Sequence, residues 1–180
     1  SIDWMNKLDA EHDNLRSALG WLLEHSPAKG ARIAASLGQF WISRSYLIEA
    51  RRWLEAAIQK NETDLSDTRF KLLNTFSLVA RNQGDYAATR RASEQSLSAS
   101  RAANNLPQII LSCHAVAALE TREGNFVRAR KLIKESLAIS RELGDEKQVG
   151  FSLSFLSNLF LSTGDYSAAR DLIEESLEIS

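Results

Sequence analysis

Three stretches of this chain carry nearly the same sequence at a spacing of 40 residues. They read GDYAATRRASEQSL from residue 84, GNFVRARKLIKESL from residue 124 and GDYSAARDLIEESL from residue 164. A fixed period between 20 and 50 residues is typical of arrays in which small supersecondary units stack on one another. The repeat therefore restricts the chain to a solenoid built from copies of one motif.

The segments around these stretches have helical periodicity. Leu72, Phe76 and Val79 lie on one face of a helix before the first glycine, and Ile133 and Leu137 share a face after the second. The chain has only two prolines and no long alternating run of β-branched residues, so strand signals are absent. The sequence therefore predicts an all-α fold of paired helices.

A glycine followed by Asp or Asn stands between the two helices of each copy. Glycine takes the left-handed backbone conformation that ends a helix, and the next side chain can cap the following helix, a contribution of about 1 kcal/mol. We expect this arrangement at Gly84, Gly124 and Gly164, and again between repeats at Gly144-Asp145.

An aromatic residue and then a small residue follow each glycine at fixed distances. We expect the aromatic residue to anchor the second helix against the first, and the small residue to let the two helices approach closely. The aromatic residues are Tyr86, Phe126 and Tyr166, and the small residues are Thr89, Ala129 and Ala169.

This pattern, with the closing pairs Ser96-Leu97, Ser136-Leu137 and Ser176-Leu177, resembles the tetratricopeptide repeat. The resemblance implies a right-handed α-α superhelix, a TPR-like solenoid of about nine helices. It also implies an earlier, divergent copy, in which Ser45-Tyr46 replaces the Gly-Tyr step. The matching positions of that copy are Gly38, Trp41, Ala50, Arg51, Leu54, Ala57 and Ile58.

The repeats divide the chain into five segments of one solenoid domain. Residues 66–104, 105–144 and 145–180 are the clear copies, and the last of them is truncated. Residues 29–65 are the divergent first hairpin, and residues 1–28 are an N-terminal capping or linker helix. Within that first segment, residues 4–25 form one amphipathic helix whose apolar face comprises Leu8, Leu15, Ala18, Leu19 and Leu22.

Two motifs near the start of the chain resemble an arrangement found in large bacterial regulators. They are Glu11-His12-Asp13-Asn14-Leu15-Arg16 and Arg52-Trp53-Leu54-Glu55. STAND-type signal-transduction ATPases, including LuxR-like and maltose-activator-like transcriptional regulators, open a tetratricopeptide array with such a helix. The resemblance implies that this chain is a fragment of such a regulator and forms its helical sensor or scaffold.

Composition and charge exclude several classes of function. The net charge is −1 and the basic residues are spread along the chain, which leaves no footprint for nucleic acid or anionic lipid. Apolar runs are only a few residues long, so no segment is expected to cross a membrane. A single cysteine fits a reducing cytosol, and we expect a cytoplasmic protein.

The sequence lacks the common catalytic motifs. It has no Gly-x-x-x-x-Gly-Lys-Ser/Thr loop, no Gly-x-Ser-x-Gly elbow and no His-Glu-x-x-His pair. Cys113 and His114 are adjacent, which points their side chains about 100° apart on a helix. We therefore expect no catalytic residue, no cofactor and no metal site in this chain.

Two polar features have both a functional and a structural interpretation. His12 between Glu11 and Asp13 suggests a metal ligand, but no second histidine follows at helical spacing, which favours a solvated or locally bonded polar cluster. Cys113 is either a reactive thiol or a buried packing residue, and its small, inward position favours packing.

One arginine per repeat follows the small residue. These arginines form either an anion-binding track or ion pairs with glutamates four residues later. We favour the ion pairs, which stabilise a helix by about 0.3 kcal/mol each. The arginines are Arg51, Arg90, Arg130 and Arg170, and the glutamates are Glu55, Glu94 and Glu174.

Binding is the function that remains. The first helices of stacked hairpins line one face of the array, and counting back from each glycine identifies the residues on that face. Apolar side chains beside amide and guanidinium groups suit a peptide or a partner helix. The candidate groove residues are Arg32, Gln39, Lys71, Asn74, Leu78, Arg81, Asn82, Leu111, His114, Thr121, Arg122, Phe151, Ser154 and Asn158.

We therefore expect a non-catalytic protein–protein interaction or ligand-sensing module of a multidomain ATP-dependent regulator. Its partner would be a protein or peptide, a small-molecule inducer, or other domains of the parent chain. The alternative is an independent scaffold that binds the peptide tail of a partner.

Overall fold

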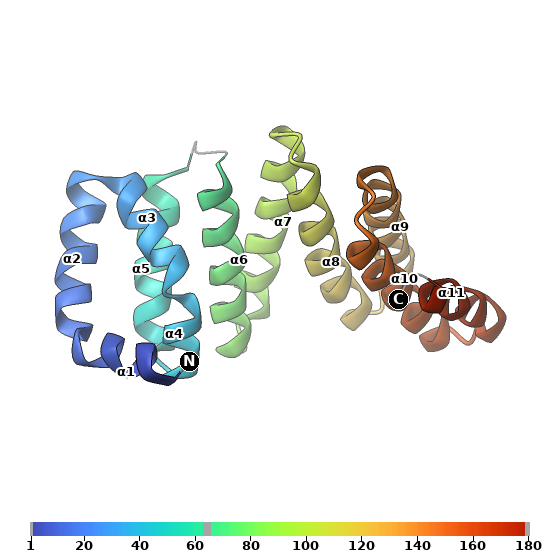
Figure 1. The fold of residues 1–180 in the computed structure, drawn as a ribbon, viewed down its shortest axis with the longest axis horizontal. Helices are drawn as coiled ribbons and strands as arrows, with labels where there is room; N and C mark the ends of the chain where they lie inside the picture. Colours follow the sequence, from blue (N-terminus) through green and yellow to red (C-terminus); the bar gives the residue numbers. More distant parts are fainter. Residues whose placement is uncertain (1, 63–65, 179–180) are drawn as a thin grey trace. The chain divides into compact units, whose positions relative to one another are not determined.

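The computed structural model describes residues 2–62 and 66–178, and all regular secondary structure in these ranges is α-helical (Figure 1). Eleven helices lie in the described ranges, against about nine expected. They are α1 (Ile2–Ala10), α2 (His12–His25), α3 (Pro27–Ser36), α4 (Gly38–Ser43), α5 (Leu47–Lys60), α6 (Asp67–Asn82), α7 (Tyr86–Ala102), α8 (Leu106–Arg122), α9 (Phe126–Leu143), α10 (Glu146–Ser162) and α11 (Tyr166–Glu178). The chain forms two compact units, which divide between Ser96 and Leu97.

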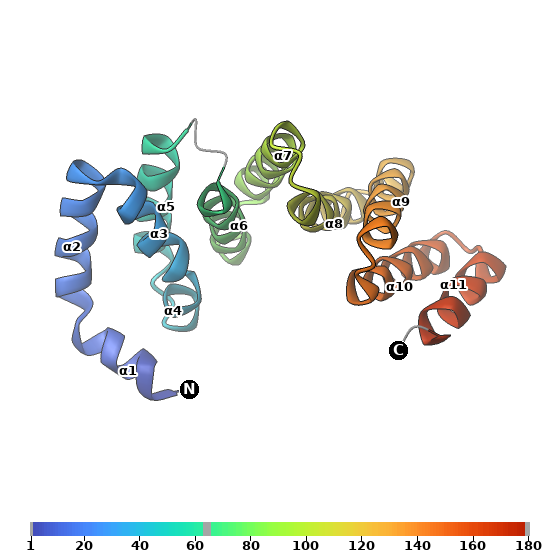
Figure 2. The ribbon, with the colours of Figure 1, turned by 45° about the horizontal axis from the view of Figure 1, so that its top comes forward.

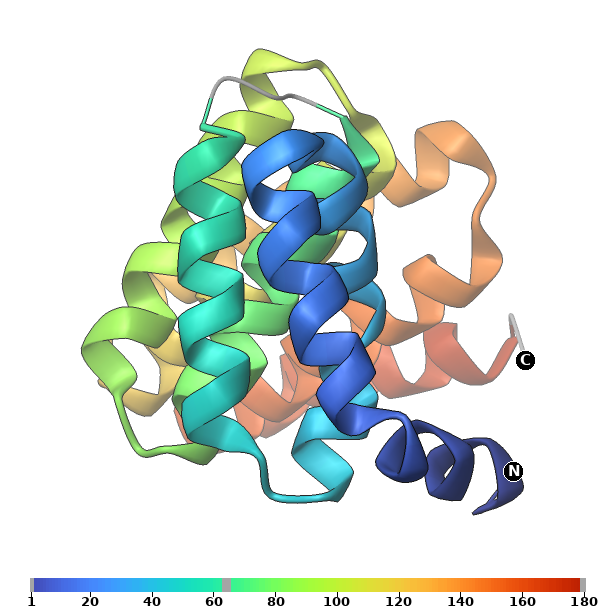
Figure 3. The same cartoon turned by 90° about the vertical axis from the view of Figure 1, so that its left-hand side faces the viewer.

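The first unit is built around α3 and α5. Helix α2 packs against both of them (Figure 3), and α6 packs against α3, α4 and α5. Phe40 and Trp41 of α4 are among the largest side chains of the core and are fully buried. Burying side chains of this size contributes roughly 2–3 kcal/mol each, so this short helix fixes the centre of the unit.

Two helices are broken where the sequence predicts continuity, which explains the higher helix count. The predicted helix over 4–25 bends at Glu11 into α1 and α2 (Figure 2). The buried residues of α2 are Leu19 and Leu23, whereas Ala18 is exposed, so the predicted apolar face was wrong at that position.

The second break separates α3 from α4 at Leu37. Gly38 begins α4 and lies against Thr75 of α6 at a distance that leaves no room for a side chain. The break therefore coincides with a close approach of α6 to the backbone of the first hairpin.

The glycine turns are confirmed. Gly84, Gly124, Gly144 and Gly164 have φ angles of 76°, 81°, 66° and 81°. The predicted caps form at three of these turns: Asp85 accepts from the Ala88 N–H at 2.9 Å, Asp145 from the Gln148 N–H at 3.1 Å and Asp165 from the Ala168 N–H at 3.2 Å. Asn125 makes no side-chain cap.

Ser45 takes the place of a glycine in the divergent first hairpin. Its φ is 62°, in the left-handed region that costs a residue with a Cβ atom about 1–2 kcal/mol. The surrounding hairpin, with Trp41 buried on one side of the turn and Ala50 on the other, holds this conformation in place.

The aromatic residues after the glycines are buried to different degrees. Phe126 is half-buried against the core of the second unit, as expected, whereas Tyr86 and Tyr166 are 43% and 71% exposed. The small residues make the close contact instead. Thr89, Ala129 and Ala169 are 3%, 0% and 0% exposed.

The second unit stacks the hairpins α8–α9 and α10–α11 (Figure 2). Its core joins Val116, Ile133 and Leu153 from successive helices, and the Cys113 thiol is buried among them. Serines fill the narrow spaces between these helices, and Ser140 satisfies its buried hydroxyl by donating to the Ser136 carbonyl at 2.8 Å. Small polar side chains thus replace part of the expected apolar packing.

Ion pairs link the second helices of successive repeats in this unit. Arg101 of α7 contacts Glu135 of α9 at 2.7 Å, and forty residues later Arg141 of α9 contacts Glu175 of α11. The predicted pairs within helices also form: Arg51–Glu55 at 2.9 Å, Arg90–Glu94 at 3.6 Å and Arg170–Glu174 at 2.7 Å. Arginines therefore form ion pairs both within single helices and between helices of successive repeats.

None of the described helices combines the length and apolar character that crossing a membrane requires.

Gly38 provides a test of the first hairpin. A Cβ atom at this position would lie 2.3 Å from Thr75 Cγ2, so Gly38→Ala should lower the free energy of unfolding by about 1–3 kcal/mol in urea denaturation. Gly20→Ala is the matched control. Its Cβ would lie 3.6 Å from the Trp53 ring, an ordinary contact, and the gain in helix propensity should stabilise the chain by about 0.5–1 kcal/mol. Equal stability of the two variants would contradict this packing.

Candidate functional site

Two exposed apolar side chains mark the predicted face of the second unit. Leu111 of α8 and Phe151 of α10 stand at equivalent positions of successive repeats and are 43% and 55% exposed. The Phe151 ring centroid lies 4.8 Å from that of His114, which is one turn after Leu111 on α8. We call Leu111 and Phe151, with the edge of His114 beside them, the Leu111–Phe151 patch.

The remaining predicted residues of this unit lie further along the same two helices. Ser154 and Asn158 of α10 are exposed, as is Arg122 at the end of α8, while Thr121 is half-buried and donates its hydroxyl to the Ala117 carbonyl at 2.8 Å. The apolar patch is therefore followed by polar side chains.

His114 was predicted as a groove residue, but its exposed fraction is only 7%. Its Nε2 atom lies 2.7 Å from Ser136 Oγ of α9 and 2.9 Å from Ser152 Oγ of α10. The two hydroxyls are 2.8 Å apart. Burial lowers the pKa of His114 to about 4, so the imidazole is neutral at neutral pH and joins three helices through uncharged hydrogen bonds.

This cluster does not have the geometry of a nucleophilic site. Ser136 and Ser152 are 0% exposed, and a nucleophile must reach its substrate. Burial, with a smaller effect of the Glu135 charge, raises the pKa of the Cys113 thiol to about 12, which keeps it protonated and inert. The interpretation of Cys113 as a packing residue is confirmed. Within residues 2–62 and 66–178, no three potential metal ligands lie close enough to hold an ion.

The predicted residues of the first unit form a more polar face. Lys71, Leu78 and Arg81 of α6 are exposed at helical spacing along one side of that helix. Arg32 of α3 and Gln39 of α4 are also exposed, on the two helices that pack against α6. This face carries basic groups and one apolar side chain.

Three predicted amides of this unit are already engaged in local hydrogen bonds. Asn74 is half-buried and accepts from the Ser96 hydroxyl at 3.4 Å. Asn82 donates to the carbonyl of Leu78 at 2.8 Å, and Gln39 donates to the hydroxyl of Ser43 at 3.0 Å. Each bond uses only part of the donor and acceptor capacity of its amide.

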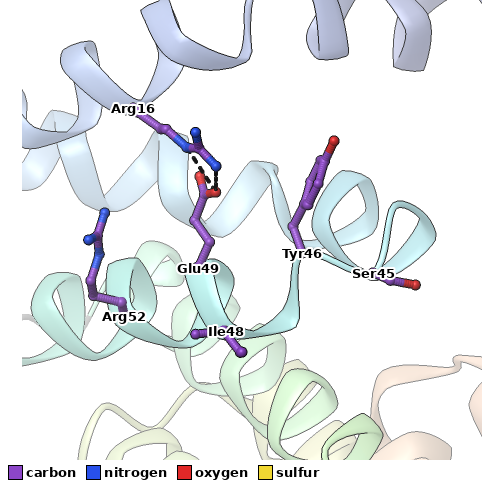
Figure 4. A pocket seen from close by; sticks show the side chains of 6 residues that line it. All are labelled: Arg16, Ser45, Tyr46, Ile48, Glu49 and Arg52. Atoms are coloured by element: carbon purple, nitrogen blue, oxygen red, sulfur yellow. Dashed lines mark hydrogen bonds and ion pairs between the residues drawn. The ribbon is translucent and has the colours of Figure 1, made fainter.

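Sequence reasoning missed Glu49 of α5, which contacts the first of the two motifs near the start of the chain. Its carboxylate accepts two bonds from Arg16, at 2.9 Å from Nε and 2.6 Å from Nη2 (Figure 4). It also lies 3.0 Å from His12 Nε2. His12 also stacks on Tyr46 with ring centroids 4.4 Å apart. His12 is thus part of a polar cluster, as predicted, but the cluster joins α2 to α5.

The environment of Glu49 favours its charged form. Burial acts to raise the pKa of this carboxyl, but the hydrogen bonds from Arg16 and the nearby His12 outweigh it and leave the pKa below its ordinary value. The i,i+4 spacing of His12 and Arg16 was the available signal, because it directs both side chains to the same side of α2.

A cavity of about 530 Å³ adjoins this cluster (Figure 4). Arg52 lies along it with its guanidinium 4.5 Å from the Trp53 ring centroid, and Ile48 is 85% exposed at its edge. Arg16 is already held by two carboxylates, those of Glu49 and Asp13, which balances its charge. The cavity therefore offers one arginine and one apolar side chain, and none of its lining residues was among the predicted groove residues.

Comparison with known proteins supports the repeat fold. A sequence profile of the tetratricopeptide repeat family matches residues 107–180. No curated protein matches the chain significantly in sequence.

Several solved structures are similar to the chain. BtubC (BKLC) from P. vanneervenii has a TM-score of 0.82 at 14% sequence identity, with 96% of this chain and 73% of that chain covered. A putative kinesin light chain of Podosopora anserina with nearly identical TPR-like repeats has a TM-score of 0.70 at 17% identity, covering 97% and 95%. MamA has a TM-score of 0.67 at 13% identity, covering 97% and 93%. These similarities and the profile match show a TPR-like helical repeat array.

The buried His114 makes stability depend on pH. Its pKa is about 4 in the folded chain against an ordinary value of 6.5, so only the unfolded chain takes up this proton as the pH falls below 6.5. The stabilisation is complete above pH 6.5 and should be lost progressively towards pH 4, by about 3 kcal/mol. Urea denaturation at several pH values should show that His114→Gln loses less unfolding free energy between pH 6.5 and pH 4 than the wild type does. The exposed His25→Gln should keep the wild-type profile, and identical profiles for all three proteins would refute the prediction.

Proposed function

We propose that the chain is a non-catalytic scaffold that binds a protein or peptide partner through the face of its first helices. The observation that carries this proposal is the Leu111–Phe151 patch. Two large apolar side chains remain exposed at equivalent positions of neighbouring repeats, whereas Ile110 and Leu153 beside them are almost completely buried. A recurring exposed apolar position on a solenoid is typical of a binding surface.

The surroundings of the patch suit a peptide. Apolar side chains provide contact area, while Ser154 and Asn158 on the same helix offer hydroxyl and amide groups for the backbone of a partner. The polar network around His114 holds α8, α9 and α10 together, so the patch is presented on a rigid support. Little side-chain ordering would then be needed on binding, which favours affinity.

A capture experiment tests this function. The chain would be used to isolate partners from its native cells, and the dissociation constant of each identified partner would then be measured. Phe151→Asp should weaken binding at least about tenfold, because it places a charge in an apolar contact. Val127→Asp, at a position 81% exposed on α9, is the matched control and should bind normally. Unchanged affinity of a correctly folded Phe151→Asp variant would exclude the patch.

We further propose that this scaffold belongs to a STAND-type, ATP-dependent transcriptional regulator and senses a protein, peptide or small-molecule inducer there. The support is the resemblance of the motifs at 11–16 and 52–55 to those of such regulators. In addition, Arg16 of the first motif donates a hydrogen bond to Glu49, which lies three residues before the second motif. Such a bond would couple an upstream domain to the first hairpin of the array.

The gene distinguishes this assignment from an independent scaffold. Reading the codons upstream of Ser1 should reveal a nucleotide-binding segment with a Gly-x-x-x-x-Gly-Lys-Ser/Thr loop. A gene without such a segment would favour the independent scaffold and leave the first proposal intact.

A further inference from the structure

The outer side of the second unit contains a groove between the second helices of two repeats. A cavity of about 520 Å³ lies there, lined by α9, α10 and α11. Its apolar lining includes Leu156 and Phe160 of α10, Ala138 of α9 and Leu172 of α11. Ala138 is exposed and Phe160 and Leu172 are half-buried, so this apolar surface is in contact with water.

The same groove occurs in the first unit with a different lining. A cavity of about 450 Å³ there is lined by α5, α6 and α7. When the repeats are aligned on their small residues, Gln59 stands at the position of Ala138, Glu62 at that of Arg141 and Gln95 at that of Glu175. The groove therefore occurs in both units, and polar side chains make up more of its lining in the first unit.

Charges of opposite sign border the apolar groove. Lys134 and Arg141 stand on the α9 side, and Asp171 and Glu175 stand on the α11 side. Arg141 and Glu175 pair with each other. Lys134 and Asp171 form no ion pair within the described part of the chain, so one unpaired charge of each sign borders the groove.

We propose that this groove, which we call the α9–α11 groove, binds a peptide segment with a large apolar side chain between an acidic and a basic residue. The apolar side chain would lie over Phe160 and Leu172. The acidic residue would face Lys134 and the basic residue would face Asp171. A volume of about 520 Å³ accommodates one such anchor with its neighbours, within the range of small binding pockets.

This surface is distinct from the Leu111–Phe151 patch. The patch lies on the first helices α8 and α10, whereas the walls of the groove are the second helices α9 and α11. A partner in the groove would leave the patch accessible, and the two sites can be tested separately.

The probe is the blocked tripeptide N-acetyl-Glu-Phe-Lys-amide, titrated into the isotope-labelled chain and followed by amide chemical shifts. The shifts should change in α9, α10 and α11 and give a saturating curve. N-acetyl-Glu-Ala-Lys-amide should bind about tenfold more weakly or not at all, because it lacks the buried ring. N-acetyl-Gln-Phe-Gln-amide should also bind more weakly, because it cannot meet Lys134 and Asp171.

Matched variants locate the site. Ala138→Trp fills the groove from an exposed position and should abolish binding, whereas Gln59→Trp, at the equivalent position of the first unit, should leave it unchanged. Lys134→Gln is the substitute test if Ala138→Trp fails to fold. It is a surface change that should not affect folding, and it should weaken binding of the charged peptide several-fold. Phe151→Asp should have no effect on this titration.

The proposal is overturned if the Phe-containing peptide shifts no amide of α9–α11, or if a folded Ala138→Trp variant binds it as the wild type does. Equal binding of the Phe and Ala peptides would overturn it as well. None of these results bears on the first-helix surface, which is tested by Phe151→Asp and the captured partner.

Discussion

The structure depends on one close contact between the two helices of each hairpin. Ala129 and Ala169 are fully buried there and Thr89 nearly so, and no larger side chain would let the helices approach as they do. A hairpin packed in this way still has an apolar side that only a neighbouring hairpin can cover. Stacking follows, and it turns one side of every first helix outwards, where Leu111 and Phe151 remain available for a partner.

Local sequence patterns were sufficient for the fold because the determining features lie within one repeat. The left-handed turns at Gly84 and Gly124 and the buried Ala129 all follow from short-range spacing. Contacts between distant residues were not accessible in this way. Glu49 lies 33 residues from Arg16, and Arg101 lies 34 residues from Glu135, so no periodicity within a helix reveals either pair.

The candidate site was predicted less completely for the same reason. Exposure of Leu111 and Phe151 follows from their register on a helix, and both were identified. His114 shares that register but is drawn inwards by Ser136 and Ser152, which come from two other helices. The sequence did not predict the α9–α11 groove, because none of its lining residues belongs to a recognisable motif and they come together only through the packing of three helices.

The hydrogen-bonded group of His114, Ser136 and Ser152 also has a consequence for how such an array can evolve. The three residues come from two successive repeats, and the other copies carry Asn74 or Ser154 at the position of the histidine. Repeats that look interchangeable in sequence are therefore not interchangeable in order. A copy of residues 66–104 placed after α9 would bring Leu72 to the position of Ser152 and leave the imidazole with one hydroxyl, whereas a second copy of residues 105–144 would bring Ser112 there and keep the group intact.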